Sequence, residues 1–415
     1  MSSRIRVAQV VTRFIAGAGG VALRGALALD PDRYQVTILA GDGGPLLAQA
    51  EAAGLGVVRL RHIVPELDPV RDAKALFELS ARLRSGRFDV VHTHSAKAGT
   101  LGRIAARRVR VPAIVHTFHG FPFHDFQSRA RRGTYLAIER RLGRITDQFL
   151  AVGGAVAADA VRLGIASPER IRAIASTVDA GIPPKTPASR AAARRKLGIL
   201  PGSKVVGTVG RVDFQKAPQD FVRAVATLNR PNVVGVWIGG GPLLDQTQRL
   251  VDELGLGERF RLLGERNDVA GLLPGLDVFA MSSLYEGLPC ALVEAVTCGI
   301  PAVATAVNAV PDLIVPGRTG LLVPPARPQL LARAIGHLLD HPDQAESMAV
   351  HASERVRTGG AFEPEALGRD LTETYERALG VAARAGTDGP EPTVLDLRDA
   401  RHPNSRRAQD PVDRP

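Results

Sequence analysis

The chain has 415 residues, of which 45% are hydrophobic, and it carries a formal net charge of +11. This hydrophobic content excludes a wholly disordered chain. The two cysteines, Cys290 and Cys298, exclude a disulfide framework, so we expect a reducing, cytoplasmic compartment. Because no apolar run reaches about 18 residues, we predict no membrane span. The apolar start IRVAQVV runs into a glycine loop, which favours a first strand over a signal peptide.

The first half of the chain alternates short apolar runs with segments of helical periodicity. We predict buried parallel strands at IRVAQVV, QVTILA, FDVVHTH, AIVHTF and QFLAV. The segments between them, such as DAKALFELSARLRSG, place apolar residues on one helical face. This alternation predicts an α/β fold with a parallel sheet and helices on both of its faces.

The alternation pauses at STVDAGIPPKTPAS, residues 176–189, which we interpret as a linker. It then resumes with predicted strands at SKVVGTVG, VVGVWIGGG, RFRLLG, DVFAMSS, PAVATAV and GLLVPP. We therefore predict two Rossmann-like, doubly wound domains that face each other across a cleft. The expected boundaries are residues 1–180 for the first domain, 181–363 for the second, 364–385 for a C-terminal helix and 386–415 for a disordered tail.

A glycine-rich loop, GAGG at residues 17–20, follows the first predicted strand. Glycines let the backbone approach a phosphate, and the N-terminus of the following helix favours negative charge. Gly17, Gly19 and Ala22 also match the looser form of the dinucleotide fingerprint, with Asp42 near the place of a ribose-binding acid. From these residues alone, a phosphate-binding loop, an NAD site and a plain structural turn all stay open.

Charged residues follow two predicted strands of the second domain. Arg211 and Lys216 lie in the loop after SKVVGTVG, where two cations suit a diphosphate, although a pair of solvated charges is the alternative. Pro289 begins a predicted helix, whose free N–H groups can take phosphate oxygens. The flanking carboxylates would repel those oxygens, so we expect them to bind vicinal hydroxyls, Glu294 those of a ribose and Glu286 those of an attached group. Together these features predict a nucleotide-sugar site.

The block MSSLYEGLPCALVEAVTCGIPAVAT, followed by PDLIVPGRTGLLVPP, resembles the donor-binding region of glycosyltransferase family 4. GTVGRVDFQKAPQDF, WIGGGPLLDQTQRLVDELGL and FDVVHTHSAKAGTLGRIAAR are similar to further landmarks of that family, and the resemblance covers roughly residues 5–380 in order. It implies the GT-B architecture and transfer of a sugar from a nucleotide sugar with retention of configuration. It also implies that no metal or other cofactor is needed.

The resemblance also implies roles for individual residues. Arg211 and Lys216 would neutralise the leaving diphosphate, and His119 would lie beside the reacting sugar. The remaining donor contacts that we predict come from two glycines of the first loop and from the helix start: Gly19, Gly20, Glu286, Gly287, Leu288, Pro289 and Glu294. The chain departs from the family pattern at Ala217, where glycine is usual, and at Asn308, Ala309 and Asp312, which replace paired glycines and a glutamate.

Five histidines cluster between residues 92 and 124. His92 and His94 are separated by one residue on a predicted strand, and we expect them to face opposite sides of the sheet. Because no cysteine joins them, we predict no metal site and give the histidines core or acceptor-binding roles. His94 and Lys97 are the residues that we expect to bind the acceptor.

The segment from Lys97 to Arg144 holds eleven Lys and Arg residues against two acidic residues, so most of the net charge lies there. Arginines beside phenylalanines suit an anionic membrane surface or a lipid-linked diphosphate, while nucleic acid or a solvated helix face are alternatives. We expect membrane contact at Phe121, Phe123, Arg129, Arg131 and Arg132.

The sequence therefore predicts a retaining, metal-independent glycosyltransferase of hexosyltransferase type. We expect a nucleotide sugar, UDP-linked, as donor and a polyprenyl-diphosphate-linked or other glycan as acceptor in cell-envelope or exopolysaccharide synthesis. The enzyme would be cytoplasmic and peripheral at the inner face of the membrane. An NAD-dependent oxidoreductase and a module that binds an anionic surface or nucleic acid are the alternatives.

Overall fold

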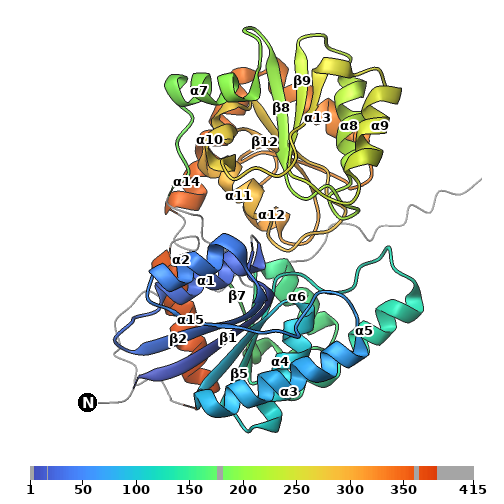
Figure 1. Ribbon diagram of the computed structural model, residues 1–415. Helices are drawn as coiled ribbons and strands as arrows, with labels where there is room; N and C mark the ends of the chain where they lie inside the picture. The colour runs from blue at the N-terminus through green and yellow to red at the C-terminus, as the bar shows by residue number, and fades with distance from the viewer. Residues whose placement is uncertain (1–3, 16, 175–180, 359–363, 381–415) are drawn as a thin grey trace, which may run out of the picture. The chain divides into compact units, whose positions relative to one another are not determined.

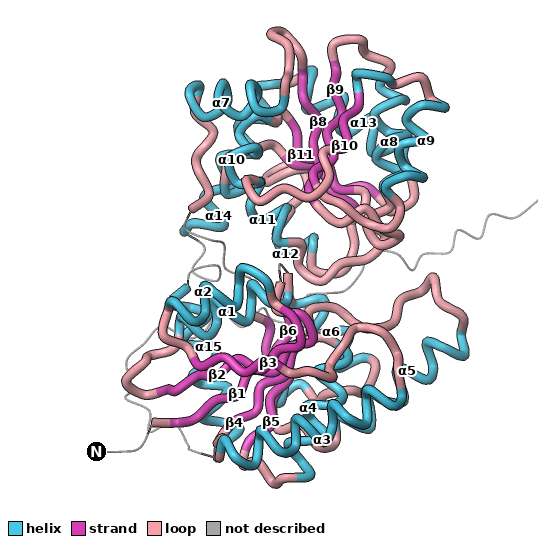
Figure 2. Tube along the Cα trace, viewed as in Figure 1, coloured by secondary structure: helices cyan, strands magenta, loops and turns pink. Residues whose placement is uncertain are grey.

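The computed structural model describes residues 4–380 apart from residue 16, residues 175–180 and residues 359–363. Within these residues the strands form two parallel sheets, each with helices on both faces (Figure 1). The helices and strands alternate along the chain, as Figure 2 shows by colour. This is the doubly wound α/β arrangement that the sequence predicts.

The first sheet has seven described strands. In spatial order they are β3 (Gly56–Arg59), β2 (Tyr34–Asp42), β1 (Ile5–Arg13), β4 (Val90–His94), β5 (Ala113–Phe118), β6 (Gln148–Ala151) and β7 (Ile171–Ala173). The strand order reverses between β1 and β4, where Val7 is in register with Val36 on one side and Val90 on the other. Loops that leave the carboxyl ends of β1 and β4 therefore diverge and form a crevice, where ligands bind in such sheets.

The second sheet has six described strands. In spatial order they are β10 (Phe260–Leu262), β9 (Val233–Ile238), β8 (Lys204–Val209), β11 (Val278–Met281), β12 (Ala302–Thr305) and β13 (Leu321–Val323). Its strand order reverses between β8 and β11, which are paired through Val206 and Val278. The predicted donor-site residues after these two strands thus leave the sheet at its switch point.

The α-helices connect successive strands or follow the last strand of the second sheet. Around the first sheet they are α1 (Ala18–Ala28), α2 (Gly44–Ala52), α3 (Pro69–Gly86), α4 (Ala96–Arg108), α5 (Arg129–Gly143) and α6 (Gly154–Arg162). The later helices are α7 (Pro187–Leu197), α8 (Pro218–Leu228), α9 (Leu244–Glu253), α10 (Val269–Leu272), α11 (Cys290–Thr297), α12 (Val310–Leu313), α13 (Pro328–Asp340), α14 (Pro342–Thr358) and α15 (Pro364–Ala378). Single turns of 3-10 helix lie at Pro168–Arg170, Gly257–Arg259 and Leu273–Gly275.

Local capping signals explain where several helices begin. The Asp68 side chain accepts hydrogen bonds from the Val70 and Arg71 amides, and Pro69 occupies the first turn of α3. Thr186 and Ser189 exchange hydrogen bonds in a capping box at the start of α7, which ends at Gly198 with a left-handed φ of 63°.

The core lies on both faces of the first sheet because side chains on a strand alternate between faces. On β1, Val7 and Val11 pack with residues of α1 and α15, whereas Ala8 and Val10 pack with residues of α3 and α4. Two-sided burial explains why the predicted strands are near-continuous apolar runs rather than alternating ones.

The last described helix, α15, belongs to the core of the first sheet although it follows the second sheet in the chain. Its Leu367, Leu371 and Tyr375 are buried with β1 and β2 residues. Arg172 of β7 forms ion pairs with Asp370 at 2.6 Å and with Glu373 at 2.6 Å. The sequence predicts this helix over residues 364–385, and the structure has it at Pro364–Ala378.

Two strands, β3 and β7, were not predicted, because each is short and lies at an edge of its sheet without a strong apolar run. Part of the predicted linker, residues 175–180, and the predicted tail, residues 386–415, lie outside the described residues. Among the described helices, none is both long and apolar enough to cross a bilayer.

Candidate active site

The loop between β8 and α8 carries the two predicted donor-site cations, and Asp213 contacts the side chain of one and the backbone of the other. Asp213 lies between them: its Oδ2 is 3.2 Å from Arg211 Nε, and its Oδ1 accepts a hydrogen bond from the Lys216 amide at 3.2 Å. The Arg211 side chain is 62% exposed, whereas that of Lys216 is only 20% exposed. The arginine is therefore free to move toward an anionic ligand, while the lysine is held in place.

Glu286 is the most constrained charged group of the site, at 6% exposure in the loop after β11. Its Oε1 accepts hydrogen bonds from Lys216 Nζ and from Ser283 Oγ, both at 2.6 Å. Its Oε2 accepts one from Gln215 Nε2 at 3.2 Å. Three donors on one buried carboxylate fix its orientation.

The sequence analysis missed the groups that support Glu286. Ser283 and Gln215 lie inside the motifs that were singled out, but only the fold shows that they converge on one carboxylate. Asn308, noted as a departure from the family pattern, accepts a hydrogen bond from the Glu286 amide at 2.8 Å and has a left-handed φ of 42°. Its departure from the pattern was the one signal that could have found it.

The start of α11 follows Glu286 directly. Leu288 and Pro289 are buried, Pro289 immediately precedes the helix, and Glu294 is half-buried one turn into it. A Cβ added at Gly287 would lie 2.1 Å from the His119 carbonyl oxygen. Only glycine fits such a close approach, so the EGLP loop after β11 packs directly on His119, the first residue after β5.

His119 and His94 form the part of the site that the first sheet contributes. His94 Nδ1 is 2.9 Å from His119 Nε2, and the His94 ring is buried at the end of β4. Burial, helped by the charge of Arg24, lowers the pKa of His119 to about 4. Burial and the neighbouring histidines lower the pKa of His94 well below its usual value. Both rings are therefore neutral at neutral pH and can exchange hydrogen bonds without carrying charge.

The expectation that His92 and His94 face opposite sides of the sheet is wrong. Their ring centroids are 4.2 Å apart, because residues two apart on a strand share a face. Within the described residues, no group of three His, Cys, Asp or Glu side chains is arranged to hold a metal ion.

The glycine loop after β1 leads into α1, where Gly17 has a φ of 75° and Gly19 and Gly20 are buried. A Cβ added at Gly19 would lie 2.8 Å from the Phe14 carbonyl carbon. Gly19 is thus required by the tight turn itself, whatever else its backbone binds.

The structure gives Lys97 a local partner. Its ammonium group forms an ion pair with Asp72 of α3 at 2.7 Å and donates to the Glu66 carbonyl oxygen. Its side chain is only 10% exposed. The acceptor-binding role assigned to Lys97 stays a prediction, and any acceptor would have to compete with Asp72.

The residues predicted to contact a membrane differ in accessibility. Phe123 is 7% exposed in a core cluster, and its ring stacks on the Phe121 ring with centroids 5.0 Å apart. The prediction that Phe123 contacts a membrane is therefore wrong, because its ring packs inside the protein. Arg129 and Arg131 are exposed at the start of α5, and Arg132 forms an ion pair with Asp125 at 3.3 Å.

The loop at residues 307–312 also contacts the first sheet's helices. The Gly154 amide, at the N-terminus of α6, donates to Asp312 Oδ2 at 2.6 Å. Ala309 is buried, and a Cβ added at Gly153 would lie 2.3 Å from the Ala309 Cβ. Burial raises the pKa of Asp312, opposed by the amides of Gly154 and Ala155. Ala309 and Asp312, two of the residues that depart from the family pattern, therefore contact the N-terminus of α6.

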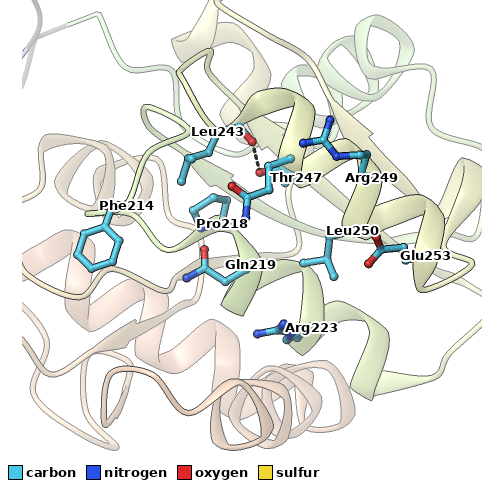
Figure 3. A pocket seen from close by; sticks show the side chains of 10 residues that line it. Phe214, Pro218, Gln219, Arg223, Leu243, Thr247, Arg249, Leu250 and Glu253 are labelled. Carbon is cyan, nitrogen blue, oxygen red and sulfur yellow. Dashed lines mark hydrogen bonds between the residues drawn. The ribbon is translucent and has the colours of Figure 1, made fainter.

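A cavity of about 470 Å³ lies between α8 and α9 and shares Phe214 with the Arg211–Lys216 loop (Figure 3). Leu243, Leu250 and Pro218 form part of its wall, and Arg223, Arg249 and Glu253 are further lining residues. None of the predicted donor-binding residues lines it.

Comparison with known proteins identifies the family to which the chain belongs. The family model described as "Glycosyltransferase Family 4" matches residues 15–181, and the model "Glycosyl transferases group 1" matches residues 189–355. An Escherichia coli UDP-Gal:alpha-D-GlcNAc-diphosphoundecaprenol alpha-1,3-galactosyltransferase is 30% identical over 314 residues, which cover 74% of this chain and 80% of that protein. A Mycobacterium marinum D-inositol 3-phosphate glycosyltransferase is 31% identical over 323 residues, 74% of this chain and 67% of that protein.

Solved structures show the same fold. Anabaena HepE, solved in complex with UDP and glucose, superimposes with a TM-score of 0.77 at 20% identity over 89% of this chain and 99% of its own. Sucrose-phosphate synthase from Thermosynechococcus elongatus gives a TM-score of 0.75 at 21% identity, over 91% of this chain and 100% of its own.

The two Rossmann-like sheets and the loops at their switch points define a glycosyltransferase of GT-B fold. The chain belongs to glycosyltransferase family 4. This membership favours the glycosyltransferase over the oxidoreductase and the surface-binding module, and it confirms the resemblance from which the sequence prediction was drawn.

Proposed function

We propose that the protein transfers a hexosyl group from a UDP-linked sugar, with retention of anomeric configuration and without a metal ion. The acceptor is a glycan carried on a polyprenyl diphosphate, in cell-envelope or exopolysaccharide synthesis. The observation that carries the proposal is a cluster of charged residues. In it the Lys216 ammonium pairs with Glu286, and Asp213 contacts both the Arg211 side chain and the Lys216 backbone amide.

Each group of the cluster has a chemical task in this proposal. Arg211 and Lys216 stabilise the negative charge that develops on the leaving diphosphate, as fixed cations do in place of a metal. Glu286 accepts hydrogen bonds from hydroxyls of the transferred sugar, and Glu294 accepts them from the ribose. The backbone at Gly19 and Gly20 contacts the phosphate or the sugar.

The reaction balances without a protein base. The bond between the anomeric carbon and the diphosphate oxygen breaks while the acceptor oxygen bonds to the same face of that carbon. The acceptor's hydroxyl proton passes to the leaving phosphate oxygen. Neutral His119, beside Gly287, supplies a hydrogen bond to the reacting sugar, and the lowered pKa of His119 supports a role without charge.

The relatives support the donor and the acceptor class. The E. coli relative is named for UDP-galactose and for a diphosphoundecaprenol-linked acceptor, and HepE was solved with UDP and glucose. Galactose, glucose and other UDP-sugars are therefore the first donors to test, and lipid-diphosphate-linked GlcNAc is the first acceptor.

The direct test is release of UDP from purified protein, with each UDP-sugar supplied in turn and with EDTA present throughout. A matched donor at about 100 times its Kd should also stabilise the protein by about 2.7 kcal/mol. NMR of the product should show the donor's anomeric configuration. Loss of turnover with EDTA that returns with added metal would contradict metal independence, and an inverted product would contradict retention.

Lys216→Ala tests the diphosphate role. We expect affinity for UDP to fall about 100-fold, because one of two cations facing the diphosphate is lost. Lys196→Ala is the matched control, since Lys196 is 53% exposed and pairs with Asp268 at 3.4 Å. Calorimetry with UDP alone measures both. Equal affinities in the two variants would contradict the role.

The proposal places the enzyme in the cytoplasm, peripheral at the inner face of the membrane. Exposed Arg129 and Arg131 at the start of α5, with Arg132 and the partly buried Phe121, support contact with anionic headgroups. Co-sedimentation with vesicles containing phosphatidylglycerol should be lost when Arg129, Arg131 and Arg132 are changed to Gln together. Retention of binding in that variant, or binding to neutral vesicles, would contradict the proposed surface.

A further inference from the structure

A buried tyrosine of α15 makes a polar contact inside the first sheet. Tyr375 is fully buried, and its hydroxyl oxygen is 2.7 Å from His92 Nδ1. The two rings meet edge to face with centroids 5.6 Å apart. A hydroxyl in such a place needs a partner, because a buried polar group without one destabilises the fold.

Both ring nitrogens of His92 have hydrogen-bond partners. Nδ1 meets the Tyr375 hydroxyl, and Nε2 lies 2.6 Å from Thr117 Oγ1. Because one nitrogen of a neutral imidazole donates and the other accepts, the tyrosine and the threonine together fix the orientation of the His92 ring.

The next ring along β4 depends on His92 for its position. The His94 ring packs on His92 with centroids 4.2 Å apart, and its Nδ1 contacts His119 Nε2 at 2.9 Å. Its other nitrogen, Nε2, is buried and has no hydrogen-bond partner among the described residues. Nothing polar therefore anchors the far side of His94, and the stacking on His92 sets where it presents Nδ1 to His119.

We propose that Tyr375 and His92 are positioning residues for His119, so that the C-terminal helix controls the geometry of the active-site histidine. The connection runs from Tyr375 through His92 and His94 to His119, four side chains from α15, β4 and the segment after β5. This inference rests on the proposed function, because it gives His119 a place beside the transferred sugar.

The kinetic test uses Tyr375→Phe, which keeps the ring and removes the hydroxyl. We expect kcat to fall about tenfold with the KM for the UDP-sugar unchanged, because the loss acts on alignment rather than on donor binding. Tyr34→Phe is the matched control: Tyr34 is also buried and its ring lies edge-on to Tyr375 at 6.0 Å, whereas the tyrosine ring in contact with His92 is that of Tyr375. We expect it to keep the wild-type kcat.

A conservative pair on the other side of His92 adds a rescue. Thr117→Val removes the hydroxyl that hydrogen-bonds to His92 Nε2 and should lower kcat, while Thr117→Ser, which keeps a hydroxyl, should retain it. A merely structural role would instead lower kcat in both tyrosine variants in proportion to their loss of thermal stability. That pattern, or a wild-type kcat in Tyr375→Phe, would overturn the proposal.

A second readout separates this proposal from the proposed function. Nitrogen-15 NMR of labelled histidine rings reports the His119 tautomer in the ligand-free enzyme. A change in the His94 and His119 resonances in Tyr375→Phe but not in Tyr34→Phe supports the coupling even if no UDP-sugar is turned over, a result that would count against the proposed function alone. Unchanged resonances in both variants would overturn the coupling.

Discussion

The two halves of the site are built from different chemistry. The second sheet contributes charged groups on loops, with Lys216 and Glu286 joined at 2.6 Å and Arg211 exposed beside them. The first sheet contributes neutral histidines, and the pKa of His119 is lowered to about 4. The difference teaches that the second sheet presents charged groups suited to a charged ligand, whereas the first sheet presents neutral groups that can align a ligand without adding charge. Changes to the charged half should therefore affect binding and chemistry most, and changes to the neutral half should affect alignment and pH dependence.

Glu286→Gln should have the largest effect, because it removes the one carboxylate that Lys216, Ser283 and Gln215 hold in place. We expect kcat to fall about 1000-fold, as when a preorganised group facing the transition state is lost. UDP release measures it. Glu258→Gln, an exposed carboxylate on the same domain, is the control. A kcat within tenfold of wild type would show that the charge of this half is not needed for chemistry.

Gly287→Ala should have the next largest effect, because it forces apart the contact between the two halves. The added Cβ would lie 2.1 Å from the His119 carbonyl oxygen, so backbone must move. We expect about a 100-fold loss of kcat for a displacement near 1 Å. Gly133→Ala, on the exposed face of α5 with nothing within 4 Å, should leave activity unchanged. Normal activity in Gly287→Ala would mean that the loop contact does not align the site.

The neutral half predicts a loss of stability in acid. Burial lowers the pKa of His92 from 6.5 to about 3, so between these values the unfolded chain binds a proton that the folded chain does not. Stability should therefore be constant above pH 6.5 and fall as the pH drops below it, by up to several kcal/mol at about 1.4 kcal/mol for each unit of pKa change.

Urea unfolding from pH 7.5 to 4.5 checks this expectation. His92→Gln should show a shallower pH dependence, since one of the neutral rings is gone, although its stability at pH 7.5 is lower. His351→Gln, at an exposed position of α14, is the control and should keep the wild-type slope. An unchanged slope in His92→Gln would show that this ring does not titrate on unfolding.

Asp312→Asn should have the smallest effect. It keeps an oxygen for the Gly154 amide, which donates to Asp312 Oδ2 at 2.6 Å, and removes only the charge beside the N-terminus of α6. We expect a change of no more than about 0.5 kcal/mol in the free energy of unfolding, because burial, which raises the pKa of Asp312, offsets the attraction of the helix N-terminus. Asp343→Asn, in the first turn of α14, is the comparison for an exposed position. A loss above about 3 kcal/mol would mean that the carboxylate does more than cap a helix.

The charged residues and the two histidines, His94 and His119, were named from the sequence, but the partners of the histidines were not, for a physical reason. The loops that follow strands carry Arg211, Lys216 and Glu286. The ends of strands can be located in a sequence from apolar runs and glycines. The two sheets followed from the same alternation. Short edge strands such as β3 and β7 bury too little to leave a pattern.

Partners of buried residues are set by distant parts of the chain and leave no local signal. Nothing near His92 indicates Tyr375, which is 283 positions away and contacts it only because α15 packs on the first sheet. Phe123 was misassigned for the same reason: an aromatic residue among arginines resembles a surface residue until its packing is known. The partners of Glu286 lie within the recognised sequence motifs, but only the fold shows that they converge on one carboxylate.

The return of α15 to the first sheet has a consequence for synthesis. While the ribosome is still making the second sheet, β1 and β2 lack the leucines and the tyrosine that later seal one of their faces. The first sheet would therefore keep an apolar strip exposed until α15 has been synthesised. Expressed without α15, it would carry that strip permanently and aggregate, so the first sheet and its helices could not be obtained alone by cutting the chain before the second sheet.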